Sequence, residues 1–309
     1  MNKYGFIFPG QGSQYVGMCK DFYENFATAR QIVEEASDCL SYSFKEVMFE
    51  GPLETLSETR YSQPAIFLMS AVILNNVQKE FPFLTPTACA GLSLGEYTAL
   101  FAADKIDFIS CLKLVALRGK LMQEACQEKR GVMRVVLGLN PDKVASFLPE
   151  GIWIANLNCP GQVVIAGYEE HMGSAEEMLK AEGARRILPL DVSGAFHTPL
   201  MKSAQLKLKK ALQEVLLKKS PVNLVMNVSG EIVSDSSLIR SSLIEQVVST
   251  TYWEKGIATL QKENITTYIE MGPGKTLAGM NKKMGVLAPT LSIEKISDLT
   301  LLESLYATT

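Results

Sequence analysis

The chain has 309 residues, of which 47% are hydrophobic and 20% are charged, and its formal net charge at pH 7 is −3. A chain of this length and apolar content can bury about 75% of its unfolded surface, which excludes disordered and fibrous architectures. The 30 basic residues are balanced by 33 acidic ones, so no overall positive field favours a nucleic acid as partner.

No apolar stretch indicates a membrane protein or an exported one. The longest apolar run, residues 66–74, is too short to span a bilayer, and the run before Pro9 is too short for a signal peptide. The six cysteines form neither a C-x-x-C pair nor a cluster with histidine at the spacing of a metal site. We therefore expect a cytoplasmic protein with reduced core thiols, no bound metal and no disulfide framework.

Strands and helices alternate along the first 130 residues. Tyr4 begins a short apolar strand that ends before Pro9, and the pair Ser62 and Pro64 marks the start of a long amphipathic helix. Such alternation is typical of a mostly parallel sheet. The expected elements are a strand at 4–8, a helix from about residue 17, a helix at 62–79, a strand at 87–90 and a helix at 108–130.

The next sixty residues follow a different order: strand, helix, two strands, helix, strand. The expected elements are a strand at 131–139, a helix at 141–148 capped by Asn140, a hairpin of strands at 152–158 and 162–167, a helix at 169–182 and a strand at 185–190. This order is typical of a ferredoxin-like subdomain, which we place at 128–192 as an insert. A lysine-rich helix to about residue 220 and strands at 222–228 and 265–271 follow.

The segment Gly91-Leu92-Ser93-Leu94-Gly95 has the G-x-S-x-G spacing of a nucleophile elbow, and it lies between a predicted strand and a predicted helix. Its small residues permit a tight turn that presents the hydroxyl group of Ser93 at the helix N-terminus. Backbone N–H groups there can stabilise an oxyanion. An ordinary turn capped by serine has the same short pattern, but this context favours a nucleophile.

A serine nucleophile usually needs a general base, and the chain contains two histidines. His171 lies on the predicted surface of a helix, where a solvated side chain is the simpler interpretation. His197 lies in the loop 193–199, and loops carry function more often than helix faces do. His197 is therefore the predicted base for Ser93.

Two further residues occupy positions that are typical of ligand contacts. Arg118 falls on the same predicted helical stripe as Leu114, Leu121 and Met122, where a guanidinium is costly unless an anion meets it. A structural ion pair or a snorkelling side chain would also account for Arg118. Gln11 lies in a flexible turn at the carboxyl end of the first strand, where α/β sheets place ligands.

Six segments, in order along almost the whole chain, together resemble the malonyl-CoA:acyl carrier protein transacylases of bacterial fatty-acid synthesis. The segments are 8–14 (FPGQGSQ), 62–65 (SQPA), 91–97 (GLSLGEY), 158–167 (NCPGQVVIAG), 195–197 (AFH) and 270–274 (EMGPG). Several such segments in the right order are more specific than the elbow alone. The resemblance implies an α/β-hydrolase-like catalytic domain, formed by 1–127 and 193–309, that carries the ferredoxin-like insert at 128–192.

The resemblance also implies the catalytic residues. Ser93 would be the acylated nucleophile and His197 its base, while the backbone N–H groups of Gln11 and Leu94 would form the oxyanion hole. The backbone carbonyl of Gln246, rather than an aspartate, would orient the histidine. The implied chemistry is ping-pong transfer, in which the malonyl group passes from malonyl-CoA to the serine and then to the phosphopantetheine thiol of acyl carrier protein.

The same resemblance implies how substrate is bound. Arg118 would pair with the free carboxylate of the malonyl group, and Gln11, Met122 and Phe196 would complete the substrate site. Phe196 resembles the bulky residue that closes the pocket against a 2-methyl branch, where methylmalonyl-specific relatives tend to carry serine. No cofactor is implied, the partners would be malonyl-CoA and acyl carrier protein, and we expect a monomer.

Leu92 is the clearest departure from the family pattern, because the family commonly has histidine before the nucleophile. This departure puts in doubt any role of that histidine, but not the nucleophile itself. One alternative is a serine esterase or thioesterase, although such enzymes usually place the histidine near the chain end and a carboxylate between serine and histidine. A second alternative is a non-catalytic docking protein for acyl carrier protein, but such a protein would not need Ser93, His197 and Arg118 together.

Overall fold

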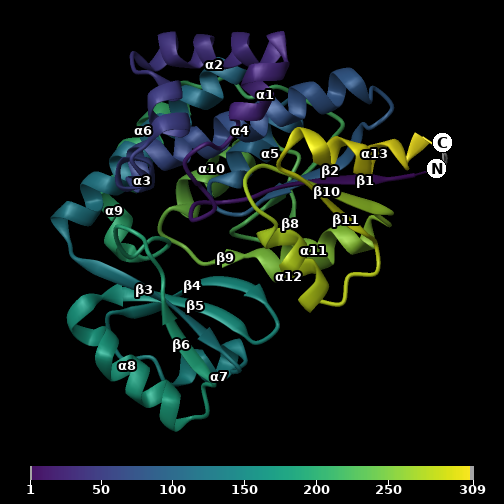
Figure 1. The fold of residues 1–309 in the computed structure, drawn as a ribbon. Coiled ribbons are helices and arrows are strands. Elements are labelled where there is room, and N and C mark those ends of the chain that lie inside the picture. The colour runs from purple at the N-terminus through teal and green to yellow at the C-terminus, as the bar shows by residue number, and fades with distance from the viewer. Residues whose placement is uncertain (1, 307–309) are drawn as a thin grey trace.

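The computed structural model describes residues 2–306, which form two β-sheets surrounded by helices (Figure 1). The larger sheet has the strand order β11-β10-β1-β2-β7-β8, and its neighbouring strands are parallel except for β7 and β8. The mostly parallel sheet expected from the alternation of elements is therefore confirmed. Its strands are β1 (Tyr4–Phe8), β2 (Pro86–Gly91), β7 (Asn223–Met226), β8 (Glu231–Ile232), β10 (Thr267–Met271) and β11 (Thr290–Ile293).

Helices cover both faces of the larger sheet. All five residues of β1 are buried: Phe6 and Phe8 join one apolar cluster, and Ile7 joins a second cluster with Trp253. Successive side chains of a strand point to opposite faces, so a strand that is buried on both sides becomes apolar throughout. The surrounding helices are α1 (Lys20–Asn25), α2 (Ala27–Leu40), α3 (Leu53–Ser57), α4 (Thr59–Glu80), α5 (Gly95–Ala102), α6 (Phe108–Glu128), α9 (Lys202–Glu214), α10 (Ser236–Gln246), α11 (Trp253–Lys262), α12 (Thr276–Lys283) and α13 (Thr300–Glu303).

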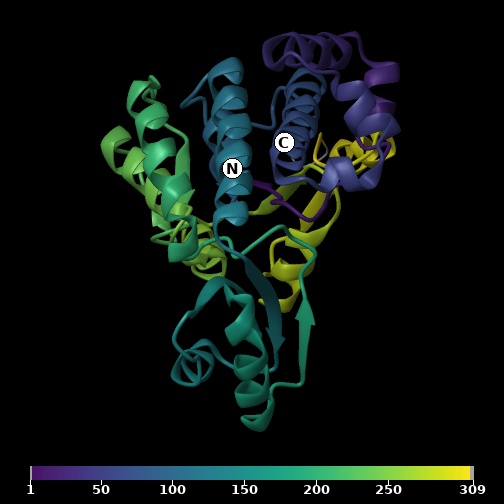
Figure 2. The same cartoon turned by 90° about the vertical axis from the view of Figure 1, so that its left-hand side faces the viewer.

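The smaller sheet and its two helices form a lobe at one end of the molecule (Figure 2). Its strand order is β6-β3-β5-β4-β9, and the predicted succession of strand, helix, two strands, helix and strand is present. The strand β9, which comes from much later in the chain and pairs parallel with β4, was not anticipated. The elements are β3 (Gly131–Leu137), α7 (Pro141–Ser146), β4 (Ile152–Cys159), β5 (Gln162–Tyr168), α8 (Glu169–Ala181), β6 (Arg186–Pro189) and β9 (Thr251–Tyr252).

Helix α4 differs from its prediction in start and in character. It begins at Thr59 rather than Ser62, because the backbone N–H groups of Tyr61 and Ser62 already bond to the carbonyl of Glu58. Pro64 consequently lies inside the helix instead of near its start. The helix is also buried around most of its circumference, since α2, α5 and α6 all pack against it, and the expected amphipathic pattern is wrong.

Two other helix ends also differ from expectation. The first helix begins at Lys20 rather than near Gly17, because Gly17 adopts a φ of +95° that a right-handed helix does not allow. Helix α9 ends at Glu214 instead of continuing to about residue 220. The chain beyond it leaves the helix, since the N–H of Lys218 bonds to the carbonyl of Lys105.

The six cysteines are free thiols, and five of them are buried, whereas Cys39 is half-buried. None of the helices within residues 2–306 combines the length and the apolarity that a bilayer-crossing segment needs.

Candidate active site

The turn between β2 and α5 has the sharp geometry of a nucleophile elbow. Ser93 lies between the two elements with a φ of +54°, in the left-handed region. A Cβ atom on Gly91 would lie 1.9 Å from carbonyl atoms of Gly95, and one on Gly95 would lie 2.2 Å from the carbonyl oxygen of Phe8. Only glycine fits at either position, and backbone strain at the serine is typical of a functional site.

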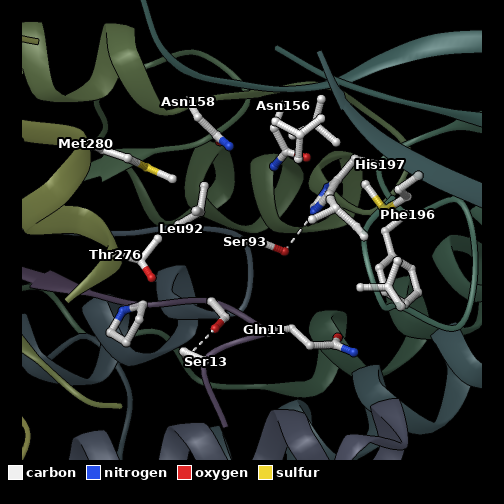
Figure 3. Close-up of a pocket in the computed structure, with 18 of the residues that line it drawn as sticks. Gln11, Ser13, Leu92, Ser93, Asn156, Asn158, Phe196, His197, Thr276 and Met280 are labelled. Atoms are coloured by element: carbon white, nitrogen blue, oxygen red, sulfur yellow. Dashed lines mark hydrogen bonds between the residues drawn. The ribbon is translucent and has the colours of Figure 1, made fainter. Parts of the chain in front are cut away.

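Ser93 and His197 lie in direct contact (Figure 3). The Oγ atom of Ser93 is 2.7 Å from Nε2 of His197, and Nδ1 of the same ring is 2.7 Å from the backbone carbonyl oxygen of Gln246. Because a carbonyl only accepts, Nδ1 carries the proton and donates it, which leaves Nε2 free to accept the serine proton. The three residues come from the elbow, the loop before α9 and the last turn of α10.

The imidazole of His197 is held in its neutral form. His197 is only 4% exposed, and burial together with the nearby charge of Arg118 lowers the pKa of its side chain to about 4. The hydrogen bond to Gln246 opposes this shift. At neutral pH the ring is therefore deprotonated at Nε2 and ready to act as a base.

Arg118 is fully buried on α6, behind the serine. Its Nη2 atom donates to Oγ of Ser93 at 3.0 Å and to Oε1 of Gln246 at 2.9 Å, and its Nη1 atom donates to Oε1 of Gln63 at 2.6 Å. These acceptors are neutral, and burial lowers the pKa of the guanidinium. A buried cation without a hydrogen-bonded anion is a site where a ligand carboxylate would be stabilised.

Gln11 joins this arrangement through Gln63. The Nε2 atom of Gln63 lies 3.3 Å from Oε1 of Gln11, and Nε2 of Gln11 donates to Oγ1 of Thr59 at 3.2 Å. A chain of amides thus links the turn after β1 to Arg118. Gln11 lies where the sequence placed it, at the carboxyl end of the first strand.

Backbone donors for an oxyanion are present next to the nucleophile. The N–H of Ser93 is already used, because it donates to Oδ1 of Asn227 at 2.7 Å. Within the described residues, the N–H groups of Gln11 and Leu94 have no hydrogen-bond acceptor. Leu94 has helical backbone angles at the N-terminus of α5, so the helix dipole adds to its donor.

A cavity of about 260 Å³ opens at Ser93 between the two sheets (Figure 3). Gln11, Met122 and Phe196 line it, whereas Arg118 lies outside the wall with no exposed surface. The other apolar lining residues are Pro9, Leu92, Met133, Val135, Val164, Leu190, Val192, Leu277 and Met280, and the other polar ones include Ser13, Asn156, Asn158, Gln162 and Thr276. Within residues 2–306, no group of His, Cys, Asp or Glu side chains could hold a metal ion.

Three polar residues of this site were not singled out from the sequence. Gln63 holds Arg118, Asn227 holds the elbow, and Glu96 is a fully buried carboxylate next to it. Gln63 and Glu96 are polar residues within largely apolar helical segments, and that pattern is visible in the sequence. Asn227 offers no local signal, since its role depends on a contact 134 residues away.

Residues 5–285 match the family model described as the acyl transferase domain. The malonyl CoA-acyl carrier protein transacylase of Bacillus subtilis is 39% identical over 299 residues, with 95% of this chain and 94% of that protein covered. The transacylase of the same name from Escherichia coli K12 is 37% identical over 289 residues, with 92% and 93% covered.

Solved structures are similar over the same length. The malonyl-CoA:acyl carrier protein transacylase of Helicobacter pylori superposes with a TM-score of 0.94 at 32% identity, and all of both chains is covered. A malonyl-transacylase in complex with its type II PKS acyl-carrier protein superposes with a TM-score of 0.93 at 35% identity, with 98% of this chain and 100% of that chain covered.

Proposed function

Since this chain belongs to the acyl transferase family, with malonyl-CoA:acyl carrier protein transacylases among its relatives, we propose that it is one of these enzymes. It transfers the malonyl group of malonyl-CoA to the phosphopantetheine thiol of acyl carrier protein and so supplies the malonyl thioester for fatty-acid synthesis. The alternative of a serine esterase or thioesterase is not favoured, because the similarity to transacylases extends over almost the whole chain.

The first half-reaction acylates Ser93. As the Oγ atom attacks the thioester carbonyl carbon, its proton moves to Nε2 of His197, and the N–H groups of Gln11 and Leu94 stabilise the oxyanion. The intermediate collapses with cleavage of the C–S bond, and Nε2 returns the proton to the departing CoA thiolate. The products are CoA and a malonyl ester of Ser93.

The second half-reaction runs the same steps in the opposite sense. The thiol of the carrier protein gives its proton to Nε2 of His197 and attacks the ester carbonyl carbon. The C–O bond to Ser93 then breaks, and Oγ takes the proton back from His197. Each step uses side chains and substrate thiols, so the proposed reaction is balanced without a cofactor.

The substrate is recognised by the groups around the serine. We assign the malonyl carboxylate to the guanidinium of Arg118, because its present acceptors are neutral oxygens. Met122 and Phe196 bound the acyl group within the cavity. The mixture of apolar and amide side chains along the remaining wall suits a pantetheine arm, which alternates methylene and amide groups.

The division of the chain belongs to the same proposal. We propose that residues 1–127 and 193–309 form an α/β-hydrolase-like catalytic domain and that residues 128–192 form a ferredoxin-like subdomain. The two separate sheets support this division, and β9 is the one strand of the proposed catalytic domain that pairs with the smaller sheet among the described residues. We further propose a cytoplasmic monomer that meets carrier protein only during transfer.

The observation that carries the proposal is the line from Ser93 through His197 to the carbonyl of Gln246, with 2.7 Å at each contact. Intact mass measured after mixing with malonyl-CoA, followed by peptide mapping, tests it. We expect one malonyl group on Ser93, no adduct on Ser93→Ala, and formation slowed by about 100-fold or more in His197→Ala. A full adduct on Ser93→Ala protein would refute the covalent mechanism.

A further inference from the structure

A carboxylate that has no part in the proposed transfer lies behind the nucleophile. Glu96, the second residue of α5, is fully buried. Its Oε1 atom accepts from the backbone N–H of Asn227 at 2.5 Å, and its Oε2 atom accepts from Nε2 of Gln246 at 2.7 Å. Burial raises the pKa of Glu96, whereas both donors and the charge of Arg118 oppose that rise and favour the ionised form. Burying a carboxylate costs free energy, so the residues to which Glu96 is hydrogen-bonded indicate its role.

One partner of Glu96 holds the elbow. The side chain of Asn227 donates from Nδ2 to the carbonyl of Gly91 at 2.7 Å and accepts from the N–H of Ser93 at 2.7 Å. It therefore fastens the strand end and the nucleophile together. The bond from its backbone N–H to Glu96 fixes this asparagine relative to α5.

The other partner, Gln246, is hydrogen-bonded to Ser93, His197 and Arg118 as well as to Glu96. Its Nε2 atom donates to Glu96 and to the carbonyl of Ser93, its Oε1 atom accepts from Arg118, and its backbone carbonyl accepts from His197. The orientation of this amide is forced. Reversing it would place an NH₂ group against the guanidinium and an oxygen against two other oxygens.

We propose that Glu96 is a positioning residue that locks the amide of Gln246, so that the backbone carbonyl of Gln246 holds His197 in its Nδ1-protonated form against Ser93. The Nε2 atom of Gln246 donates to two acceptors. One is the side chain of Glu96, and the other is the backbone carbonyl of Ser93. The expected effect on kcat rests on the proposed function, whereas the expected effect on the tautomer of His197 does not depend on it.

The substitution Glu96→Gln tests the lock with a side chain of nearly the same shape. The backbone N–H of Asn227 cannot be reversed, so the new carbonyl must face it, and the new NH₂ group must then face Nε2 of Gln246. We expect kcat for malonyl transfer to fall by about 10-fold or more while KM for malonyl-CoA stays within about threefold, because a small misplacement of the base acts on the chemical step.

Glu270→Gln is the matched control. Glu270 is another fully buried carboxylate, but it accepts from the N–H groups of Leu277 and Ala278 and from the hydroxyl of Ser292, and none of these bonds involves Gln246 or His197. We expect its kcat to stay within about threefold of wild type. An equal loss of kcat in both variants would assign the effect to the burial of a charge in general and overturn the proposal.

The tautomer of His197 gives a readout that activity does not. The chain has two histidines, so the imidazole ¹⁵N spectrum at neutral pH contains two rings, and a His171→Gln variant assigns them. We expect wild-type His197 to be protonated at Nδ1 alone and Glu96→Gln to show a mixture of tautomers. An unchanged His197 tautomer together with a kcat within about twofold of wild type would overturn the proposal. If the wild-type protein does not transfer malonyl groups, the proposed function is refuted, but the spectrum still tests whether Glu96 controls the tautomer of His197.

A double-mutant cycle tests whether Glu96 acts through Gln246. Gln246→Met removes the amide but keeps the backbone carbonyl. We expect Glu96→Gln to add no further loss of kcat in the Gln246→Met background, whereas additive losses would overturn the proposal. If Glu96→Gln does not fold, Gln246→Met alone decides: the same mixture of His197 tautomers is expected, and an unchanged tautomer would contradict the lock.

Discussion

Arg118 donates a hydrogen bond of 3.0 Å from Nη2 to the Oγ atom of Ser93, so a buried cation touches the candidate nucleophile directly. The same hydroxyl lies 2.7 Å from Nε2 of His197. The hydroxyl group makes both contacts at once, because it accepts from the guanidinium and donates its own proton to Nε2. A malonyl carboxylate at Arg118 would pair with the cation, and the hydroxyl of Ser93 could keep its bond to His197.

Substitution Arg118→Ala should harm malonyl transfer far more than acetyl transfer. Only malonyl-CoA carries the carboxylate that a desolvated guanidinium would pair with, and truncating one member of such a pair costs about 2 to 5 kcal/mol. The measurement is kcat/KM for malonyl-CoA and acetyl-CoA with the same carrier protein. Arg118→Lys is the control, since it keeps the charge but loses the two-pronged donor. Equal losses on both substrates would assign Arg118 to structure instead.

The acylation rate should be insensitive to acid down to about pH 5. Burial and Arg118 lower the pKa of His197 to about 4, so the neutral, base-competent ring persists as the pH falls and is lost only as the pH drops through that value. We expect the rate of CoA release at pH 5 to be within about twofold of the rate at pH 7.5. A histidine with an ordinary pKa near 6.5 would be about 97% protonated at pH 5. A loss of about 30-fold in protein that is still folded, by circular dichroism at the same pH, would contradict the low pKa of His197.

Substitution Phe196→Ser should widen the acyl site. Phe196 is 5% exposed and forms part of the cavity wall directly before the base. We expect wild type to use methylmalonyl-CoA poorly, because the ring would occupy the space that a 2-methyl branch needs, and Phe196→Ser to use it better. Competition between the two CoA esters measures the preference. Equal use of both substrates by wild type would show that this side chain does not set the selectivity.

Substitution Leu92→His should change activity little. The elbow places its steric demands on Gly91 and Gly95, and the Leu92 side chain points along the cavity toward Thr276 rather than toward Oγ of Ser93 (Figure 3). In the proposed mechanism His197 is the base and the oxyanion donors are backbone groups, so we expect kcat/KM to change by less than about tenfold, or about 1.4 kcal/mol. A wild type that is inert toward malonyl-CoA but rescued by Leu92→His would instead make this leucine a loss of function.

Local sequence chemistry predicted much of the fold. The hairpin β4–β5 and the cap of α7 were anticipated because turn residues and helix caps act over a few positions: the Asn140 side chain accepts from the N–H of Lys143. Helix ends were less predictable where distant backbone intervenes. Lys218 leaves the helical path because its partner, the carbonyl of Lys105, lies more than 100 residues earlier.

For the site, the sequence by itself determined the elbow, because the spacing of Gly91, Ser93 and Gly95 is a local steric requirement, and it singled out His197 by its loop. The tertiary structure alone decided that His197 and Gln246 meet, and that Glu96 and Asn227 hold the elbow from behind. Those contacts join residues 49 to 150 positions apart. A hydrogen bond depends on where two atoms lie in space, and only the packing of the sheet and its helices brings such distant atoms within reach.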